Sequence, residues 1–566
     1  AINGWSQGHA RFRNWPVVYT LSNQSDIYVG ESLNAAARLR QHSDSTSKKH
    51  LRGARIVFDE TFNKSVCLDL ESFLIKLFAG DGHYSVLNGN HGVTDADYYG
   101  RETYQGAFLK IFDALRELGA FTRSIREIEN DDLFKLSPFK ALTQDQAVAV
   151  EDILEGLFDD LGRNRTSEIV IQGGPGTGKT VVAIYLMKLL SDIQHADLTE
   201  PEDADSLFSD FFTPGYPELL DSFKVGLVVP QQSLRKSVER VFRKTPGLHT
   251  QQVLTPFQVG NVLEPFDLLI VDEAHRLGQR AAQAAGPLNA QFAEINRRLF
   301  GSDDLRLTQL DWIAAQSRHQ IFLVDEAQAV RPSDLPREVL SGLVARTDQQ
   351  GRRYPLASQM RVRAGDDYVG YIRALLRCPT TSPRTFPGYD LQFFDDPVQL
   401  RAAILQRDHE VGLARLIAGY AWPWNSKTDP AATDITLGGL ELRWNSRAVD
   451  WINSPGSSAE VGSIHTVQGY DLNYAGVIIG KDLRFDPVGR RVCFDRRNYF
   501  DRRGMSNNGI IGITYDDDDI LTFVQNIYAV LLTRGILGTY VYVCDEPLRD
   551  VLRPYFTATP AGTGAA

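Results

Sequence analysis

The sequence predicts an α/β fold in which a small α/β domain at the N-terminus is followed by two larger domains built on parallel sheets. The chain of 566 residues has room for about three or four domains. From residue 146 onward, short apolar runs recur between helical stretches. Because these runs do not alternate between polar and apolar residues, they suit strands that are buried on both faces of a parallel sheet. A glycine-rich pattern of the phosphate-binding kind directly follows one of them.

The N-terminal part of the chain reads as short strands and helices. Val17–Tyr19 and Ile27–Gly30 are β-rich runs on either side of the polar segment Ser22–Asp26, and this arrangement predicts a β-hairpin. Residues 33–42 and 67–79 have apolar side chains at helical spacing, so we expect a helix over each.

A helical connector comes next. Apolar side chains recur every three to four residues between 95 and 129, and Ser137–Lys140 then interrupts the pattern. We therefore predict four segments: a small N-terminal domain, a helical connector, a first parallel-sheet domain and a second one, at residues 1–92, 93–138, 139–347 and 348–566.

Seven short runs in the two larger domains read as buried strands: 168–172, 225–229, 268–271, 321–324, 391–394, 477–479 and 540–543. Two stretches have the composition of insertions. Residues 196–222 are acidic, and residues 484–519 are rich in arginine and aspartate. The run Asp516–Asp519 at the end of the second stretch is predicted to be a solvated loop.

Composition and charge limit the possible classes of protein. Hydrophobic residues make up 43% of the chain, yet no run approaches the roughly 18 apolar residues of a membrane span. No signal-like pattern stands at the N-terminus, so we expect a cytoplasmic protein. The four cysteines form no CxxC pair, which argues against a disulfide framework or a zinc site. A net charge of −11 argues against a uniformly basic nucleic-acid binder, but it permits a local basic channel.

The strongest motif is a P-loop pattern, which follows the strand-like run Ile169–Ile171 and precedes an apolar helix. Its residues are Gly173-Gly174-Pro175-Gly176-Thr177-Gly178-Lys179-Thr180. Glycines allow backbone N–H groups to approach phosphate oxygens, and the start of the helix adds positive potential. We expect Lys179 to contact the β- and γ-phosphates of ATP and Thr180 to hold Mg²⁺.

A P-loop needs an acidic partner at the end of a second strand. Asp272 and Glu273 follow the apolar run 268–271, and a similar run ends in Asp325-Glu326-Ala327-Gln328. On local pattern alone, either could supply the partner. In the first run, Asp272 would orient the Mg²⁺ shell and Glu273 would polarise the attacking water.

The order of the motifs resembles that of a superfamily 1 helicase. The segments that carry the resemblance are Leu142–Gln146, the P-loop, Val228–Leu234, Thr255–Gln258, Asp272–His275, Asp325–Gln328, Gln359–Arg361, Ile464–Gly469 and Tyr528–Gly535. The third and sixth motifs, Asp-Glu-Ala-Gln and Thr-Arg-Gly, are most similar to the Schlafen group of helicase domains. The resemblance covers roughly residues 137–550 and implies two RecA-like motor domains with ATP bound between them.

The resemblance also implies roles for single residues. It favours Asp272 as the magnesium partner, because helicases place a further acidic strand end with a glutamine later in the chain as a γ-phosphate sensor, here Asp325 and Gln328. Gln146 would read adenine. Arg361 and Arg534 would be the two arginine fingers. Gln468 and Gly469 lie in the segment that resembles motif V and would contribute to the nucleotide site.

Residues 17–90 resemble the GIY-YIG nucleases, with Val17-Val18-Tyr19 in place of the first triplet and Tyr28-Val29-Gly30 as the second. The residues that match the family pattern are Tyr19, Tyr28, Arg38, His42, Glu71 and Asn88. The resemblance implies that Glu71 binds one divalent metal, Mg²⁺ or Mn²⁺, which stabilises the leaving oxygen. Arg38 would neutralise a phosphate oxygen. Tyr19, Tyr28 or His42 would orient or deprotonate the water, and the sequence does not choose among them.

Together these patterns predict an ATP-dependent DNA helicase or translocase coupled to a metal-dependent endonuclease, with defence against foreign DNA or repair as its setting. Single- or double-stranded DNA is the expected partner, and RNA stays open. Trp422, Trp424 and Trp444 could stack on bases, although burial is the commoner role of tryptophan. The alternative is a nucleic-acid-dependent ATPase switch whose N-terminal module only binds and targets the nucleic acid.

Overall fold

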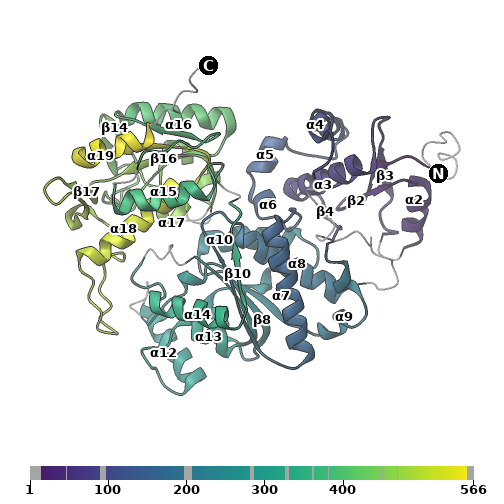
Figure 1. Ribbon diagram of the computed structural model, residues 1–566, viewed down its shortest axis with the longest axis horizontal. Coiled ribbons are helices and arrows are strands. Elements are labelled where there is room, and N and C mark those ends of the chain that lie inside the picture. The colour runs from purple at the N-terminus through teal and green to yellow at the C-terminus, as the bar shows by residue number, and fades with distance from the viewer. Residues whose placement is uncertain are drawn as a thin grey trace. The chain divides into compact units, whose positions relative to one another are not determined.

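The computed structural model describes most of the chain, namely residues 14–45, 48–89, 97–196, 207–280, 286–325, 331–359, 362–379, 382–447, 450–467 and 470–557. The chain forms two compact units (Figure 1). Unit 1 comprises residues 1–164, 180–223 and 237–252, and unit 2 comprises residues 165–179, 224–236 and 253–566. None of the described helices is long and apolar enough to cross a membrane.

Unit 1 begins with a four-stranded sheet in the order β3-β1-β2-β4. The strands are β1 (Val17–Ser22), β2 (Asp26–Ser32), β3 (Gly53–Val57) and β4 (Ser85–Val86). β1 and β2 form the predicted antiparallel hairpin, in which Tyr19 faces Gly30. A Cβ atom at Gly30 would overlap the Tyr19 hydroxyl, so only glycine lets the tyrosine lie across β2.

Helices cover this sheet and continue into the connector. They are α2 (Ala35–Asp44), α3 (Lys64–Asp81), α4 (Arg101–Glu117), α5 (Ile125–Asn130) and α6 (Asp132–Lys135). One hydrophobic core joins Val18 and Val29 of the sheet to Leu74 of α3 and to Phe108 and Phe112 of α4. The predicted connector therefore packs directly on the N-terminal domain. Unit 1 also holds α7 (Gln144–Gly162), α9 (Tyr216–Leu219) and the greater part of α8 (Lys179–Gln194) and α10 (Gln232–Lys244).

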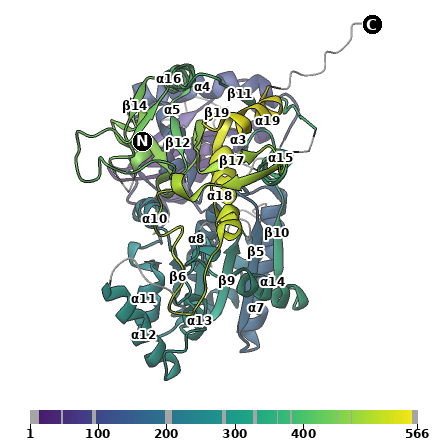
Figure 2. The same cartoon turned by 90° about the vertical axis from the view of Figure 1, so that its left-hand side faces the viewer.

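The first sheet of unit 2 has six parallel strands in the order β10-β5-β9-β8-β6-β7. They are β5 (Ser167–Gly173), β6 (Val225–Val228), β7 (Val253–Leu254), β8 (Phe266–Val271), β9 (Ser317–Val324) and β10 (Arg353–Leu356). Figure 2 shows β6, β9, β5 and β10 in this order across the sheet. Because β10 pairs with β5, this sheet continues beyond the boundary predicted at residue 347. Its core includes residues of α11 (Pro256–Asn261), α13 (Gln309–Ala315) and α14 (Arg337–Gln349). Helix α12 (Gly286–Phe300) contacts α11 and α13.

The second sheet of unit 2 has five parallel strands in the order β11-β19-β16-β12-β15. They are β11 (Asp390–Phe393), β12 (Ala414–Ala418), β15 (Val461–Ser463), β16 (Leu472–Ile479) and β19 (Gly535–Val543). Helix α16 (Pro397–Val411) packs on one face. The other face carries α15 (Asp366–Arg377), α17 (Ile464–Val467), α18 (Asp517–Leu532) and α19 (Glu546–Phe556) (Figure 1). The prediction of an α/β fold with two parallel sheets is confirmed.

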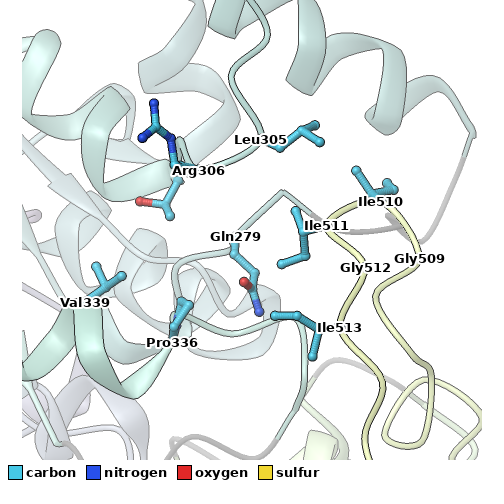
Figure 3. A pocket seen from close by; sticks show the side chains of 11 residues that line it. Gln279, Leu305, Arg306, Pro336, Val339, Gly509, Ile510, Ile511, Gly512 and Ile513 are labelled. Atoms are coloured by element: carbon cyan, nitrogen blue, oxygen red, sulfur yellow. The ribbon is translucent and has the colours of Figure 1, made fainter.

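Two separate antiparallel pairs of strands belong to the same part of the chain as the second sheet. One is β13 (Ile435–Leu437) with β14 (Leu440–Leu442), and the other is β17 (Leu483–Asp486) with β18 (Arg491–Phe494). The predicted insertion at 484–519 contains the loop 509–513. This loop lines a cavity of about 590 Å³ together with Leu305, Pro336 and Val339 (Figure 3). Asn508 Nδ2 donates to the carbonyl of Arg280 at 3.0 Å, so this loop is tied to the first-sheet part of unit 2.

The prediction of a loop at Asp516–Asp519 is wrong. Asp516 caps α18 by accepting from the N–H groups of Asp518 and Asp519, and Asp517–Asp519 form the first helical turn. Aspartate is favoured at both positions because it accepts from free N–H groups and faces the positive end of the helix dipole. Of the three tryptophans considered for stacking, Trp444 is buried, while Trp422 and Trp424 are half-buried.

Candidate functional site

The P-loop connects the carboxyl end of β5 to the start of α8. Gly176 and Gly178 adopt left-handed backbone conformations, with φ of 84° and 78°, which glycine tolerates without strain. The Lys179 ammonium is buried and donates to the carbonyl oxygens of Gly173 and Gly174, both at 2.8 Å. The lysine therefore lies folded across the loop.

Two acidic strand ends lie on the same edge of the sheet as the P-loop. β8 ends in Asp272 and Glu273, and β9, which lies between β8 and β5, ends in Asp325. Asp272 is fully buried and accepts the N–H of Glu273 at 2.9 Å. Asp325 Oδ2 lies 4.0 Å from Lys179 Nζ. The carboxyl edge of an open parallel sheet is where such folds bind ligands.

Glu273 is held against His275. The two side chains approach to 3.1 Å, between Oε2 and Nε2. The backbone N–H of Asp325 points at His275 Nδ1 from 3.4 Å, which favours the tautomer with its proton on Nε2, facing the carboxylate. Glu273 also has a left-handed backbone, φ 49°, which is uncommon outside glycine and frequent at functional sites.

The electrostatic surroundings keep Glu273 ionised. Burial acts to raise the pKa of its carboxyl, but the facing His275 and the cations of Lys179 and Arg534 lower it more, so the net pKa lies below the ordinary value. Glu273 therefore stays charged at neutral pH and can accept a hydrogen bond from a water molecule.

Two further residues of unit 2 contribute to this edge. Arg534 follows α18, is 2% exposed, and donates to the Tyr470 carbonyl at 3.1 Å. Its charge is one of those that lower the pKa of the Glu273 carboxyl. Gln359, which follows β10 and begins the segment Gln359–Arg361 of the helicase resemblance, donates to the carbonyl of Pro175 at 2.6 Å.

Other predicted site residues are not placed at this edge by the structure. Gln328, Arg361, Gln468 and Gly469 lie outside the described residues. Gln146 and Thr180 belong to unit 1. Gln146 is buried in the first turn of α7 and accepts the N–H of Thr143 at 3.1 Å, and Thr180 follows Lys179 in the first turn of α8. Their roles toward adenine and Mg²⁺ stay predictions.

This donor set fits a nucleoside triphosphate with a divalent cation. The buried ammonium of Lys179 matches phosphate oxygens, and the space beside Gly174 is open, since a Cβ there would meet no atom within 4 Å. The buried carboxylate of Asp272 is the oxygen donor that Mg²⁺ prefers.

The family assignment agrees with this geometry. Residues 166–545 match the family described as "Schlafen group 3, DNA/RNA helicase domain". The chain belongs to this family. Its helicase domain contains both parallel sheets, the P-loop and the acidic strand ends, so the predicted helicase-type ATPase is confirmed at the level of the family.

Two individual proteins are also similar to this chain. The uncharacterized protein YPL245W of Saccharomyces cerevisiae is 26% identical over 422 residues, which cover 68% of this chain and 84% of the yeast protein. A crystal structure of Pif1 helicase from Bacteroides, in complex with ADP-AlF3 and ssDNA, is 10% identical and aligns with a TM-score of 0.24 over 70% of this chain and 92% of that one.

In the N-terminal sheet of unit 1, the structure brings three predicted residues together. The Tyr19 hydroxyl lies 2.7 Å from His42 Nε2, and the rings of Tyr28 and His42 are 5.2 Å apart. Lys48 Nζ lies 4.2 Å from the centre of the Tyr28 ring. Tyr19 and His42 are buried, so the cluster is a preorganised group of proton-carrying side chains.

Arg38 and Glu71 lie near the same cluster. Burial raises the pKa of the Tyr19 phenol far above its ordinary value, with smaller contributions from Tyr28 and Glu71 that raise it and from Arg38 that lower it. Arg38 also donates to Gln41 Oε1 at 2.8 Å. Asn88 is bonded through both amide atoms to the main chain of Val29, at 3.0 and 2.8 Å, and so braces the strand that carries Tyr28.

Two residues that lie in these sites, His275 and Lys48, have no role in the sequence-based prediction. His275 was part of a recognised motif, but its contact with Glu273 depends on the left-handed turn, which no sequence pattern announces. Lys48 is not among the residues that match the nuclease pattern, and its position over Tyr28 depends on where the chain returns after α2.

Proposed function

We propose that the chain is an ATP-driven motor that translocates along nucleic acid and unwinds it. The observation that carries this proposal is the meeting of Lys179, Glu273, Asp325 and Arg534 at the carboxyl edge of the first sheet. Lys179 would bind the β- and γ-phosphates, and Glu273 would accept a proton from the attacking water. Arg534 would stabilise the charge that develops on the transferred phosphate.

Mg²⁺ would neutralise phosphate charge when bound, and Asp272 with Thr180 are the residues proposed to hold it. DNA is the proposed substrate. The family name covers DNA and RNA alike, so the same assays are run with an RNA strand, and preferential unwinding of RNA duplexes would reassign the substrate.

A partial duplex with a single-stranded overhang tests the motor. We expect fluorescently followed strand release that requires ATP and is absent in Lys179→Ala. The competing function is an ATPase switch that clamps nucleic acid without separating strands. Strand-stimulated ATP turnover with no strand release, on overhangs of either polarity, would favour the switch and contradict unwinding.

We also propose that the N-terminal domain is a metal-dependent endonuclease. The grouping of Tyr19, Tyr28 and His42, with Arg38 and Glu71 nearby, supports it. Glu71 would bind the divalent metal, which would stabilise the leaving oxygen when bound. Because burial raises the pKa of Tyr19, the phenol stays protonated at neutral pH and would orient the water through its hydrogen bond, while His42 is the better proton acceptor.

Glu71→Gln tests this proposal because it removes the carboxylate charge and keeps the shape. We expect loss of metal-dependent cleavage with strand-stimulated ATP turnover unchanged. Glu102→Gln, at an exposed position in the first turn of α4, is the matched control and should cut normally. Cleavage that persists in purified Glu71→Gln would favour the alternative in which this domain only binds and targets nucleic acid.

Coupling between the two activities is the remaining part of the proposal, and contacts within unit 1 support it. Arg123 donates to the carbonyls of Gly80 and Asp81 at the end of α3, the helix that carries Glu71. The same guanidinium donates to Asp131 at 2.7 Å, and Arg240 of α10 donates to the same carboxylate oxygen at 2.8 Å.

Helix α10 begins within Val228–Leu234, a segment of the helicase resemblance that is proposed to contact the nucleic-acid strand. Movement of this segment would pass along α10 to Asp131 and on to α3. A second contact, from Ser237 to Asp132 at 2.6 Å, reinforces the connection. A packed link of this kind can transmit a change of position, whereas a flexible tether only raises the local concentration of the second enzyme.

Asp131→Asn tests the link. Its Oδ1 caps α6 through the N–H of Leu133, which asparagine can also do, so the substitution mainly removes the charge shared by Arg123 and Arg240. We expect cleavage whose pattern depends on ATP in the wild type and in the exposed control Asp113→Asn, but not in Asp131→Asn. The same ATP dependence in all three proteins would contradict this route.

A further inference from the structure

An arginine that no sequence motif contains lies at the acidic end of β9. Arg373, on α15, places its guanidinium 3.5 Å from Asp325 Oδ1. Its side chain is 29% exposed, whereas that of Asp325 is 4% exposed. A partly accessible cation therefore meets a buried carboxylate that belongs to the other sheet of unit 2.

The same carboxylate is shared with the P-loop lysine. Lys179 Nζ lies 4.0 Å from Asp325 Oδ2, while Arg373 approaches Oδ1. Two cationic side chains thus flank the single carboxylate of Asp325, one on each oxygen. Both could turn to phosphate oxygens, because a cation in a low-dielectric site attracts an anion strongly. The position of Lys179 marks the β- and γ-phosphate end of the proposed ATP site.

Helix α15 is held firmly on the second sheet. Tyr368, Ile372 and Leu375 are fully buried in the core of that sheet, so Arg373 is carried on a fixed helix. The Tyr368 hydroxyl donates to the carbonyl of Leu532 at 2.9 Å, two residues before Arg534. Arg373 and Arg534 are therefore mounted on one packed block, and both reach the acidic edge of the first sheet.

We propose that Arg373 is a further arginine of the ATP site, which contacts the γ-phosphate and distinguishes ATP from ADP. The proposal rests on the proposed ATPase function. Arginine suits this place because its guanidinium is always charged and can bond phosphate oxygens through two parallel N–H groups. The γ-phosphate would compete with Asp325 for Arg373, so the closure of the two sheets would depend on which nucleotide is bound.

Nucleotide affinity is the measurement that tests this role, because it needs no turnover. Binding of a non-hydrolysable ATP analogue and of ADP is measured by calorimetry for the wild type, Arg373→Gln and Arg373→Lys. We expect Arg373→Gln to weaken analogue binding by about tenfold or more and to change ADP binding by less than about twofold. Arg373→Lys keeps the charge but loses the paired N–H groups of the guanidinium, so its affinity for the analogue should lie between those of the wild type and Arg373→Gln.

Arg377→Gln is the matched control, because Arg377 is exposed in the last turn of the same helix. It should bind both nucleotides as the wild type does, and thermal unfolding checks that every variant is folded. Equal weakening of analogue and ADP in Arg373→Gln, or no weakening, would overturn the proposal, since a residue that only positions Asp325 cannot tell the two nucleotides apart. Absence of nucleotide binding by the wild type would instead overturn the ATP site itself.

Discussion

Replacement of Glu273 by glutamine separates catalysis from binding at the proposed ATP site. The substitution keeps the size of the side chain and removes its charge. Glutamine accepts the same left-handed backbone as glutamate, and its amide can keep the close approach to His275 Nε2, which lies 3.1 Å from the carboxylate in the wild type. The fold should therefore survive.

The expected magnitudes differ sharply. Because the replacement keeps the shape of the side chain, the loss of charge should cost roughly 1 kcal/mol of stability, the typical cost of a single substitution. A positioned general base contributes about 10²–10⁴ in rate. Turnover should therefore fall by a factor of this size, because the activation free energy rises by roughly 3–5 kcal/mol. ATP affinity should be equal or higher, because Lys179 and Arg534 lose a competing anion.

The assay measures strand-stimulated ATP turnover at saturating ATP, together with nucleotide affinity and the midpoint of thermal unfolding. The reasoning is refuted if Glu273→Gln keeps turnover within about threefold of the wild type while it binds nucleotide normally. Loss of turnover that accompanies a large fall in stability would show instead that Glu273 mainly holds the turn.

Three further changes test other parts of the site and the fold. Lys179→Ala should abolish stimulated ATP turnover, because a buried cation leaves the P-loop, and more than about a tenth of wild-type turnover would contradict its placement. Arg534→Ala should lower turnover by about 10³ with nucleotide binding largely kept, and binding loss with normal turnover at saturation would contradict a transition-state role. Burial raises the pKa of Asp482 from 3.8 to about 7, so the folded state holds this proton longer than the unfolded state and stability falls as pH rises through that window. Asp482→Asn keeps an acceptor for the Tyr528 hydroxyl. Between pH 4 and pH 8, its free energy of unfolding relative to the wild type should rise by up to about 4 kcal/mol. Equal pH dependence of the two proteins in chemical denaturation would contradict this.

The fold could be predicted because its signals are local. Ile169–Ile171 and Ile321–Val324 are uninterrupted apolar runs, and in the structure these residues are fully buried in parallel strands, as that pattern requires. The boundary between the two sheets is harder to predict from the sequence. β10 (Arg353–Leu356) is not an uninterrupted apolar run, and it belongs to the first sheet only because it pairs with β5.

The candidate site could be predicted where one short segment carries the chemistry, as in the P-loop. It could not be predicted where the site depends on distant segments. Nothing near Arg373 in the sequence indicates that it meets Asp325, because the contact depends on how α15 packs on the second sheet. The prediction of a loop at Asp516–Asp519 is wrong for a related reason. A run of aspartates is typical of a loop, and only the position of α18 shows that this run caps a helix.

The most direct test of the central claim, an ATP-driven motor and a metal-dependent nuclease on one chain, measures ATP turnover and strand cleavage in the same reaction. Wild type, Lys179→Ala and Glu71→Gln are compared on one long end-labelled duplex with Mg²⁺, with and without ATP. The predicted result is that Glu71→Gln hydrolyses ATP at the wild-type rate without cutting, while Lys179→Ala fails to hydrolyse ATP and cuts with an altered rate or pattern. Cleavage that is untouched by Glu71→Gln, together with ATP turnover that survives Lys179→Ala, would contradict it.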